Sequence, residues 1–197
     1  MAKRKIKKRL ADLIRKKKVN PEERFNIETI LLEHRQVFLS DIIDDVSAKK
    51  VVEQLLALDL ISSKQPIMLR INSGGGGIFA GMSIINTMRT LKSPVITFVS
   101  GAACSMAALI FVCGVKRIMS TNTVWMCHPT AGGIGHDYFP FVKDRVKGLE
   151  LYQKIKEEIL KKNTKLTAGE IEKIQNGGEI WLTAEECLQK GITDYVV

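Results

Sequence analysis

Apolar and polar positions along most of this chain repeat with two alternating periods. Short runs rich in Ile, Val and Phe predict buried strands, and the stretches between them carry apolar residues at helical spacing. The predicted strands are 36–40, 66–73 and 94–100, and the predicted helices between them are 44–60 and 78–91. Either Asp44 or Asp45 is the expected N-cap of the first helix. Strands that alternate with helices predict an α/β fold whose largely parallel sheet is flanked by helices.

The second half of the chain keeps the same alternation. A helix is predicted to begin near Ser105, and strands are predicted at 116–120, 123–128 and 192–197. A long helix is predicted from Pro140 to Asn163, because apolar residues recur on one of its faces. These residues are Val142, Val146, Leu149, Tyr152, Ile155 and Ile159. Two S/T-x-x-E capping boxes predict two short helices before the last strand.

Charge separates the chain into two parts. The 197 residues carry a net charge of +9. Residues 1–20 contain ten Lys or Arg and one Asp, whereas the remainder contains twenty basic and twenty acidic side chains. Residues 1–20 are therefore predicted to form a basic N-terminal arm, either a short amphipathic helix or a solvated, disordered segment. Such an arm suits contact with a polyanion, such as nucleic acid or an anionic membrane. Residues 21–197 are expected to form one folded domain.

The composition of the chain predicts a soluble, cytoplasmic protein. Hydrophobic residues make up 45% of the chain, and no apolar run reaches the roughly 18 residues of a membrane span. Four cysteines stand in apolar or small-residue segments, without CxxC spacing and without a secretory signal ahead of them. This usage predicts reduced thiols. No His, Cys, Asp or Glu cluster has metal-ligand spacing, so we expect no metal and no organic cofactor.

Ser105 is the first residue whose position suggests chemistry. It stands among small residues in GAACSMAAL, where a strand should give way to a helix. Its hydroxyl would serve either as the N-cap of that helix or as a nucleophile. The second role is plausible at the carboxyl edge of the sheet, where open α/β sheets place their sites. Cys104, beside it, is a second candidate nucleophile.

A serine nucleophile needs a general base within hydrogen-bond reach, and the chain has three histidines. His34 lies in a charged segment before the first core strand, and His136 lies in the glycine-containing stretch GGIGHDY. His128 ends a predicted strand at the same sheet edge as Ser105 and is followed by Pro129. His128 is therefore the better candidate for the base.

A run of glycines follows the strand predicted at 66–73. The segment INSGGGGIFAG lacks the GK[ST] ending of a P-loop and the GxGxxG spacing of dinucleotide sites, so it gives little support for nucleotide binding. Glycines also let the backbone approach a substrate closely and turn its amides inward. The run is therefore predicted to be a turn that supplies an oxyanion hole.

Four motifs in order make the chain resemble the proteolytic subunit of the Clp protease, the ClpP family. INSGGGGIFAGMSIINTM is similar to the family's INSPGG-x-x-x-AGM-x-I-x-x-TM, and GAACSMAAL is similar to its nucleophile turn, G-x-A-A-S-M-A/G. VWMCHPTAGG resembles the base segment M-I-H-Q-P-x-G-G, and WLTAEECLQKGITD resembles the ending F-x-S-x-x-E-A-x-E-Y-G-x-x-D. The likeness runs from about Ile30 to Val197 and identifies a divergent member of the family.

The resemblance implies a crotonase-like fold and a serine endopeptidase that cuts unfolded proteins or peptides. The implied site residues are Ser105 as nucleophile, His128 as base, Glu179 in place of the family's acidic Asp, and the amides of Gly75 and Met106 as the oxyanion hole. The resemblance also implies a homo-oligomeric ring, or two stacked rings that meet at the helix 140–163. Polypeptide is the implied substrate, and the domain 21–197 is the implied peptidase domain.

Departures from the family's pattern leave partners and chemistry open. Arg70 stands at a strand position that is commonly aromatic in the family and belongs to the surface where an AAA+ unfoldase docks. Pairing with a standard Clp ATPase is therefore in question. Two other functions also remain open. One is a crotonase-fold enzyme acting on acyl-CoA, and the other is a non-catalytic scaffold subunit whose basic arm binds nucleic acid or a membrane.

Overall fold

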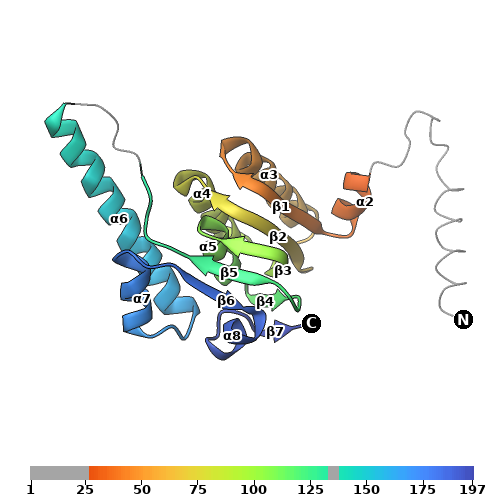
Figure 1. Cartoon of the computed structure of the whole chain (residues 1–197). Coiled ribbons are helices and arrows are strands. Elements are labelled where there is room, and N and C mark those ends of the chain that lie inside the picture. Colours follow the sequence, from red (N-terminus) through yellow and green to blue (C-terminus); the bar gives the residue numbers. More distant parts are fainter. Residues whose placement is uncertain (1–26, 133–137) are drawn as a thin grey trace, which may run out of the picture. The chain divides into compact units, whose positions relative to one another are not determined.

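The computed structural model describes residues 27–132 and 138–197 (Figure 1). The predicted basic arm, residues 1–20, and the histidine His136 lie outside the described residues, so the arm's polyanion contact stays a prediction. The chain divides into two units, residues 1–34 and residues 35–197. The first unit contains the helix α2 (Ile27–Glu33), and every other element described belongs to the second.

The described residues of the second unit place seven strands in one sheet. They are β1 (Gln36–Ile43), β2 (Ile67–Gly76), β3 (Val95–Cys104), β4 (Lys116–Met119), β5 (Val124–Cys127), β6 (Ile180–Thr183) and β7 (Tyr195–Val196). Neighbouring strands are parallel except β5 and β6, which pair antiparallel. The prediction of an α/β fold with a largely parallel sheet is confirmed. The sequence pattern does not predict β6, because four residues beside a capping box carry too short an alternation to stand out.

The long strand β3 divides the sheet. Its first half, from Ile96 to Val99, pairs with β4, and its last three residues, from Ala102, pair with β5. The other side of β3 pairs with β2, which pairs in turn with β1. As a result β2, β3 and β5 are neighbours at their carboxyl ends, where chemistry is expected in a parallel sheet.

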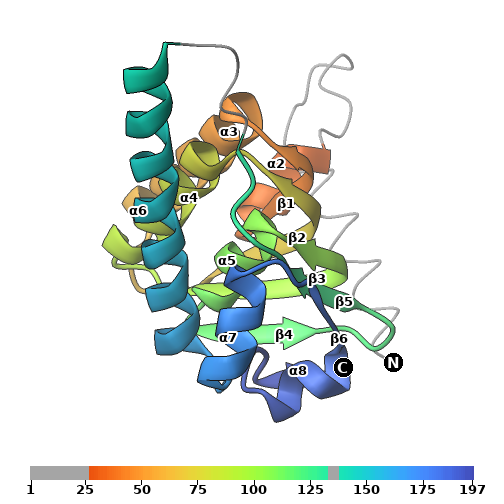
Figure 2. The same cartoon turned by 60° about the vertical axis from the view of Figure 1, so that its left-hand side comes forward.

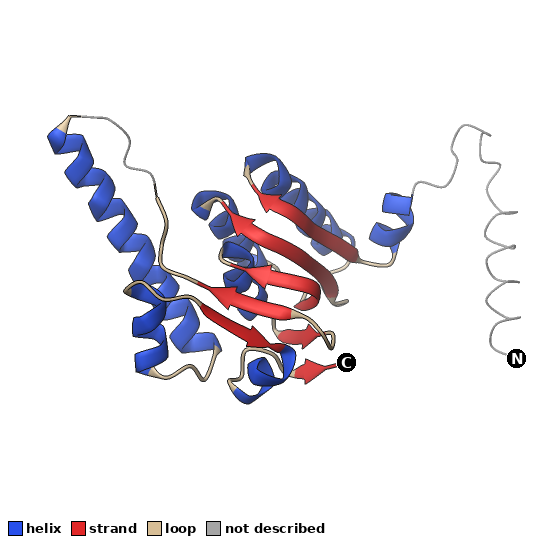
Figure 3. Cartoon of the chain, viewed as in Figure 1, coloured by secondary structure: helices blue, strands red, loops and turns tan. Residues whose placement is uncertain are grey.

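Helices form where local signals start them. The helices α3 (Asp45–Ile61), α4 (Ile78–Thr90) and α5 (Met106–Val112) cover one face of the sheet (Figure 1, Figure 3). Asp44, rather than Asp45, is the N-cap of α3, because its carboxylate accepts the Ser47 amide and the Ser47 hydroxyl accepts the Asp44 amide. Every residue of α5 is buried, which fixes the segment that follows Ser105.

Three further helices follow β5 in the chain. They are α6 (Phe139–Asn163), α7 (Ala168–Gln175) and α8 (Ala184–Gln189). Thr167 with Glu170 and Thr183 with Glu186 form the two predicted capping boxes, which start α7 and α8. Figure 2 shows α6 standing beside the sheet, with α7 against its carboxyl-terminal half. Among the described residues, no helix is both long enough and apolar enough to cross a lipid bilayer.

The first three residues of the glycine run belong to a strand, so the predicted turn is wrong for them. Strand β2 continues to Gly76, and its partners across from Gly75 and Gly76 are Ile42 and Ile43 of β1. Gly76 has a φ of 150°, and a Cβ placed on it would stand 2.2 Å from the Ile43 carbonyl oxygen. Gly76 therefore keeps the ladder going where β1 comes too close for any side chain.

Candidate active site

Ser105 forms the turn between β3 and α5. Its φ of 56° and ψ of −120° strain an L residue, and such conformations cluster at functional turns. The turn is anchored because the Ser105 N–H donates to the Met126 carbonyl at 2.8 Å and its own carbonyl accepts from Ala108 at 3.1 Å. By position Ser105 is the N-cap of α5, but its hydroxyl makes no capping hydrogen bond. The alternative that this side chain only caps the helix is therefore wrong.

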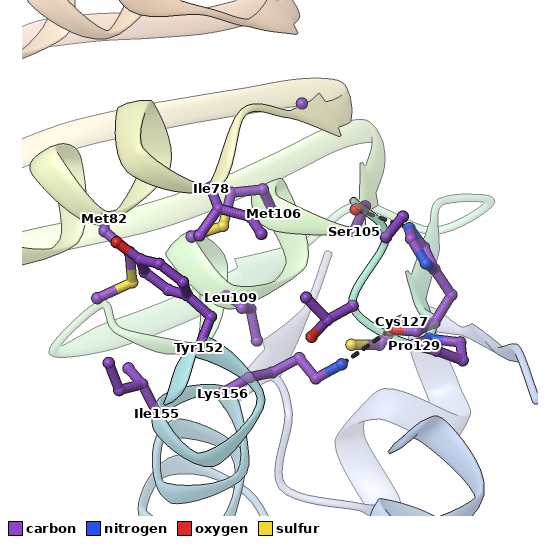
Figure 4. A pocket seen from close by; sticks show the side chains of 14 residues that line it. Ile78, Met82, Ser105, Met106, Leu109, Cys127, Pro129, Tyr152, Ile155 and Lys156 are labelled. Atoms are coloured by element: carbon purple, nitrogen blue, oxygen red, sulfur yellow. Dashed lines mark hydrogen bonds between the residues drawn. The ribbon is translucent and has the colours of Figure 1, made fainter. Parts of the chain in front are cut away.

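His128 follows β5 directly. Because Cys104 of β3 pairs with Met126 of β5 in a parallel register, Ser105 and His128 leave the sheet at the same edge. The Nε2 atom of His128 lies 2.8 Å from Ser105 Oγ, a hydrogen-bond distance (Figure 4). His34, in contrast, is exposed and belongs to the first unit. The structure thus joins the predicted nucleophile to the predicted base.

Gly75 packs against the turn that carries Ser105. A Cβ placed on Gly75 would lie 2.6 Å from Ser105 Cβ and 3.0 Å from the Met106 amide nitrogen. With a φ of 98°, this position requires glycine on both steric and conformational grounds. The Gly75 N–H donates to the Ser73 hydroxyl at 3.1 Å, and that hydroxyl donates to the Asp41 carbonyl. The two predicted oxyanion donors are therefore close together, and one of them has a partner within the protein.

Glu179 lies beside the end of β5. In the antiparallel β5–β6 register Cys127 pairs with Ile180, so His128 and Glu179 are the next residues on the two strands. The Oε2 atom of Glu179 accepts the indole N–H of Trp181 at 2.9 Å. Among the described residues, no hydrogen bond joins Glu179 to the His128 ring. The register brings the third predicted residue to the site, and its carboxylate is turned toward its own strand.

Cys104 is a poor candidate for the nucleophile. It is buried beneath the turn, and burial, together with the negative charge of Glu179, raises the pKa of its thiol. A raised thiol pKa lowers the thiolate fraction at neutral pH. Cys104, Cys113, Cys127 and Cys187 are all free thiols. Burial raises the pKa of Cys127 to about 11 and that of Cys187 to about 12, as expected for inert core cysteines.

A pocket that is partly open to solvent lies next to Ser105 and His128 (Figure 4). Its apolar wall is Ile78, Met82, Met106, Leu109 and Ile155. Lys156 of α6 also lines it, is 7% exposed, and donates from Nζ to the His128 carbonyl at 3.1 Å. Burial lowers the pKa of this lysine. The sequence analysis missed Lys156, although it stands four residues after Tyr152 and three before Ile159, on the apolar face of its helix.

Comparison with known proteins agrees with the fold and with the geometry at the sheet edge. The family model described as Clp protease matches residues 16–197. An ATP-dependent Clp protease proteolytic subunit of Streptococcus gordonii is 34% identical over 181 residues, which cover 89% of this chain and 91% of the relative. Proteins of the same name from Streptococcus mutans and Streptococcus agalactiae are 33% and 32% identical, with the same coverage.

These matches define a serine-type endopeptidase with the crotonase-like α/β fold. The chain belongs to the Clp protease family. The expected family is therefore confirmed. Among the three functions that the sequence left open, membership favours the peptidase over an acyl-CoA enzyme.

Proposed function

We propose that Ser105 is the nucleophile and His128 the general base of this endopeptidase. The supporting observation is the 2.8 Å separation of Ser105 Oγ and His128 Nε2. As Oγ bonds to the scissile carbonyl carbon, His128 takes the hydroxyl proton and then passes it to the leaving amine as the C–N bond breaks. Water next attacks the acyl-enzyme ester, with His128 again as base, which releases the acid and restores the serine.

The amides of Gly75 and Met106 are the proposed oxyanion donors. They flank the nucleophile, and a backbone N–H pair of this kind stabilises the negative oxygen of the tetrahedral intermediate. The Gly75 amide would exchange the neutral Ser73 hydroxyl for a charged oxygen. Hydrogen bonds to charged acceptors are roughly twice as strong as neutral ones, so the exchange is favourable in the transition state.

Glu179 is the proposed third member of the triad. Its support is the antiparallel β5–β6 register. Cys127 pairs with Ile180, so the next position along the ladder sets Glu179 opposite His128. Trp181 uses one carboxylate oxygen, and a carboxylate has about four acceptor sites on its two oxygens. A rotation of the side chain would let the other oxygen accept from Nδ1–H of His128, which would hold the ring in the tautomer that the mechanism needs.

Active-site labelling tests this assignment. We expect a fluorophosphonate probe to modify Ser105, and we expect Ser105→Ala to abolish both labelling and peptide cleavage. Glu179→Gln should lower kcat by about 10²-fold or more and leave labelling slow but detectable. The matched control is Glu185→Gln, an exposed carboxylate on α8. Cleavage that persists in Ser105→Ala, or acyl-CoA turnover that is insensitive to the probe, would contradict the proposal.

We infer further that the subunits assemble into a ring and that the substrate is polypeptide. Large apolar side chains are exposed on several elements, which is expected where a surface is covered by another subunit. Among them are Ile42 and Val46 where β1 meets α3, Leu60 and Ile61 at the end of α3, and Phe139, Phe141 and Leu151 on α6. The helix predicted at 140–163 corresponds to α6 and remains the proposed contact between rings. Native mass spectrometry should give a multiple of the 22.0 kDa subunit, and Phe141→Glu should halve the mass of a double ring.

An AAA+ unfoldase is the candidate partner, since the relatives are named as ATP-dependent. Arg70, where the chain departs from the family pattern, is held in place by its neighbours. Its guanidinium donates a hydrogen bond to the Gln36 side chain and lies 4.8 Å from the centre of the Phe98 ring. We expect a Clp ATPase to stimulate protein degradation more strongly in Arg70→Tyr than in the wild type. The four free thiols are in keeping with the cytoplasmic location that the sequence predicts.

A further inference from the structure

Lys156 is a buried cation in the pocket beside the nucleophile. Lys156 is 7% exposed, and its side chain runs from α6 toward Cys127 and Pro129 (Figure 4). The ammonium has three N–H donors, and the structure uses one of them, for the His128 carbonyl at 3.1 Å. Buried lysines are rarely left without an ionic partner, because removing an ammonium from water is costly.

The protein offers Lys156 no anion among the residues that the structure describes. No carboxylate in residues 27–132 or 138–197 forms an ion pair with its ammonium. The one ionisable group whose charge would act on Lys156 in the described residues is Cys127, and burial raises the pKa of that thiol to about 11, so it is neutral at physiological pH. The positive charge in this pocket is therefore uncompensated within the described fold.

The position and the lining of the pocket indicate which kind of substrate side chain would bind beside Lys156. Ser105 and His128 are among the residues that line the pocket, so a substrate side chain next to the bond being cut would enter it. Met106, Leu109 and Ile155 line its sides, where they would contact methylene groups. The lysine supplies the polar end. A side chain that is apolar near the backbone and anionic at its tip fits all three features.

We propose that Lys156 makes this pocket a subsite for an acidic substrate side chain, glutamate before aspartate, on the acyl side of the scissile bond. The inference rests on the proposed function, since it takes Ser105 as the nucleophile. The carboxylate of the substrate accepts hydrogen bonds from the Lys156 N–H groups that are not bonded to the His128 carbonyl. It also neutralises the charge of the buried ammonium. Lys156 is thus a specificity-determining residue of the pocket.

The test compares peptides that differ in one residue. Four fluorogenic peptides carry Glu, Gln, Leu or Lys immediately before the reporter amine, and the enzyme is the full-length assembled protein. We expect kcat/KM of the wild type for Glu to exceed that for Gln by about 10- to 100-fold, as for a charge-assisted hydrogen bond to a buried ammonium. In Lys156→Met that ratio should fall to about one, and the Leu peptide should become the best substrate.

The controls distinguish recognition of the substrate side chain by Lys156 from a role in positioning the His128 backbone. Lys154→Met, at an exposed site on the same helix, should leave the Glu-to-Gln ratio unchanged. If Lys156 only holds the His128 backbone, Lys156→Met would slow all four peptides equally, and the proposal would be overturned. A wild-type ratio of one or less would overturn it without any variant.

Labelling of Ser105 distinguishes the two levels of inference. A fluorophosphonate probe reports the nucleophile independently of the peptide side chain. Labelling without a preference for Glu would refute the acidic subsite and leave the proposed function standing. Absence of both labelling and cleavage would refute the proposed function, and the acidic subsite with it.

Discussion

Two buried cations lie at opposite ends of the parallel strands. Arg35 precedes β1 at the amino ends, and Lys156 faces the carboxyl ends of β3 and β5. The Arg35 guanidinium makes five hydrogen bonds, to the carbonyls of Leu58, Ser62, Gln65 and Pro66 and to the Ser93 hydroxyl. The Lys156 ammonium makes one.

The amino end of the sheet serves stability, and the carboxyl end serves chemistry. Arg35 ties the ends of α3 and the loops before β2 and β3 into one network, so its donors are satisfied by the fold itself. Lys156 keeps donors that the described fold does not satisfy, next to the bonded pair Ser105 and His128. A buried ammonium usually has an ionic partner, so a lysine whose described partner is one backbone carbonyl calls for an explanation. Four changes test this contrast.

The largest expected effect is on activity at the carboxyl end. His128→Ala removes the proposed base, and kcat should fall by about 10³-fold or more. The melting temperature should stay close to that of the wild type, because the partly exposed His128 ring contributes a single described hydrogen bond. The measurement pairs peptide kinetics with a thermal melt. A large loss of stability in this variant would break the contrast between the two ends.

The next effect is on stability at the amino end. Arg35→Met leaves several buried carbonyls without their donor, and we expect a loss of about 3 kcal/mol in the free energy of unfolding. Denaturant titration measures it. Arg35→Lys, which keeps the charge but has fewer donors, should recover part of the loss. Activity per folded subunit should be unchanged in both variants, and a selective loss of kcat would argue against a purely structural Arg35.

Lys156→Met should change the free energy of unfolding in the opposite direction from Arg35→Met. Burial lowers the pKa of Lys156, so the charged form is disfavoured in the folded protein, and removal of the charge should stabilise it by about 1 kcal/mol. The penalty is fully present below the folded pKa and disappears above the unfolded pKa, where both states are neutral. The difference between variant and wild type should therefore shrink as the pH rises toward 10.5, the lysine's reference value, and should be absent above it. A destabilised variant would show that the bond to His128 outweighs the burial cost.

The smallest effect concerns a lysine that does have an acidic partner. Lys190 pairs with Glu170, and this pair together with the Thr167 amide lowers the pKa of Glu170 to about 2. The folded pKa lies below the reference value of 4.5, so the stabilisation is present above pH 4.5 and is lost as the pH falls toward 2. The pair is partly exposed, and we expect about 1 kcal/mol or less. Glu170→Gln should flatten this part of the acid titration of stability, whereas Glu158→Gln, on the exposed face of α6, should not.

The candidate site was predictable to the extent that its signals are local. Ser105 stands between a strand and a helix, His128 stands at a strand end, and both features are visible in a few consecutive residues. The glycine run by itself indicated an oxyanion hole, but the choice of Gly75 within it came from family resemblance. Glu179 came from the resemblance alone, because nothing in its own neighbourhood marks a role. Lys156 was missed because a lysine on a helix with many charges is usually solvated.

The amino-acid sequence was enough to predict the alternation of strands and helices, a helix start at Asp44 or Asp45, the helix starts at Thr167 and Thr183, and the candidate nucleophile and base. These follow from periodicity and from hydrogen bonds between residues at most four positions apart. Only the tertiary structure decided that the glycine run continues β2, that β6 enters antiparallel and aligns Glu179 with His128, and that Lys156 is buried. Strand register and burial depend on contacts between residues far apart in the chain, and no local pattern encodes which distant segment will cover a given side chain.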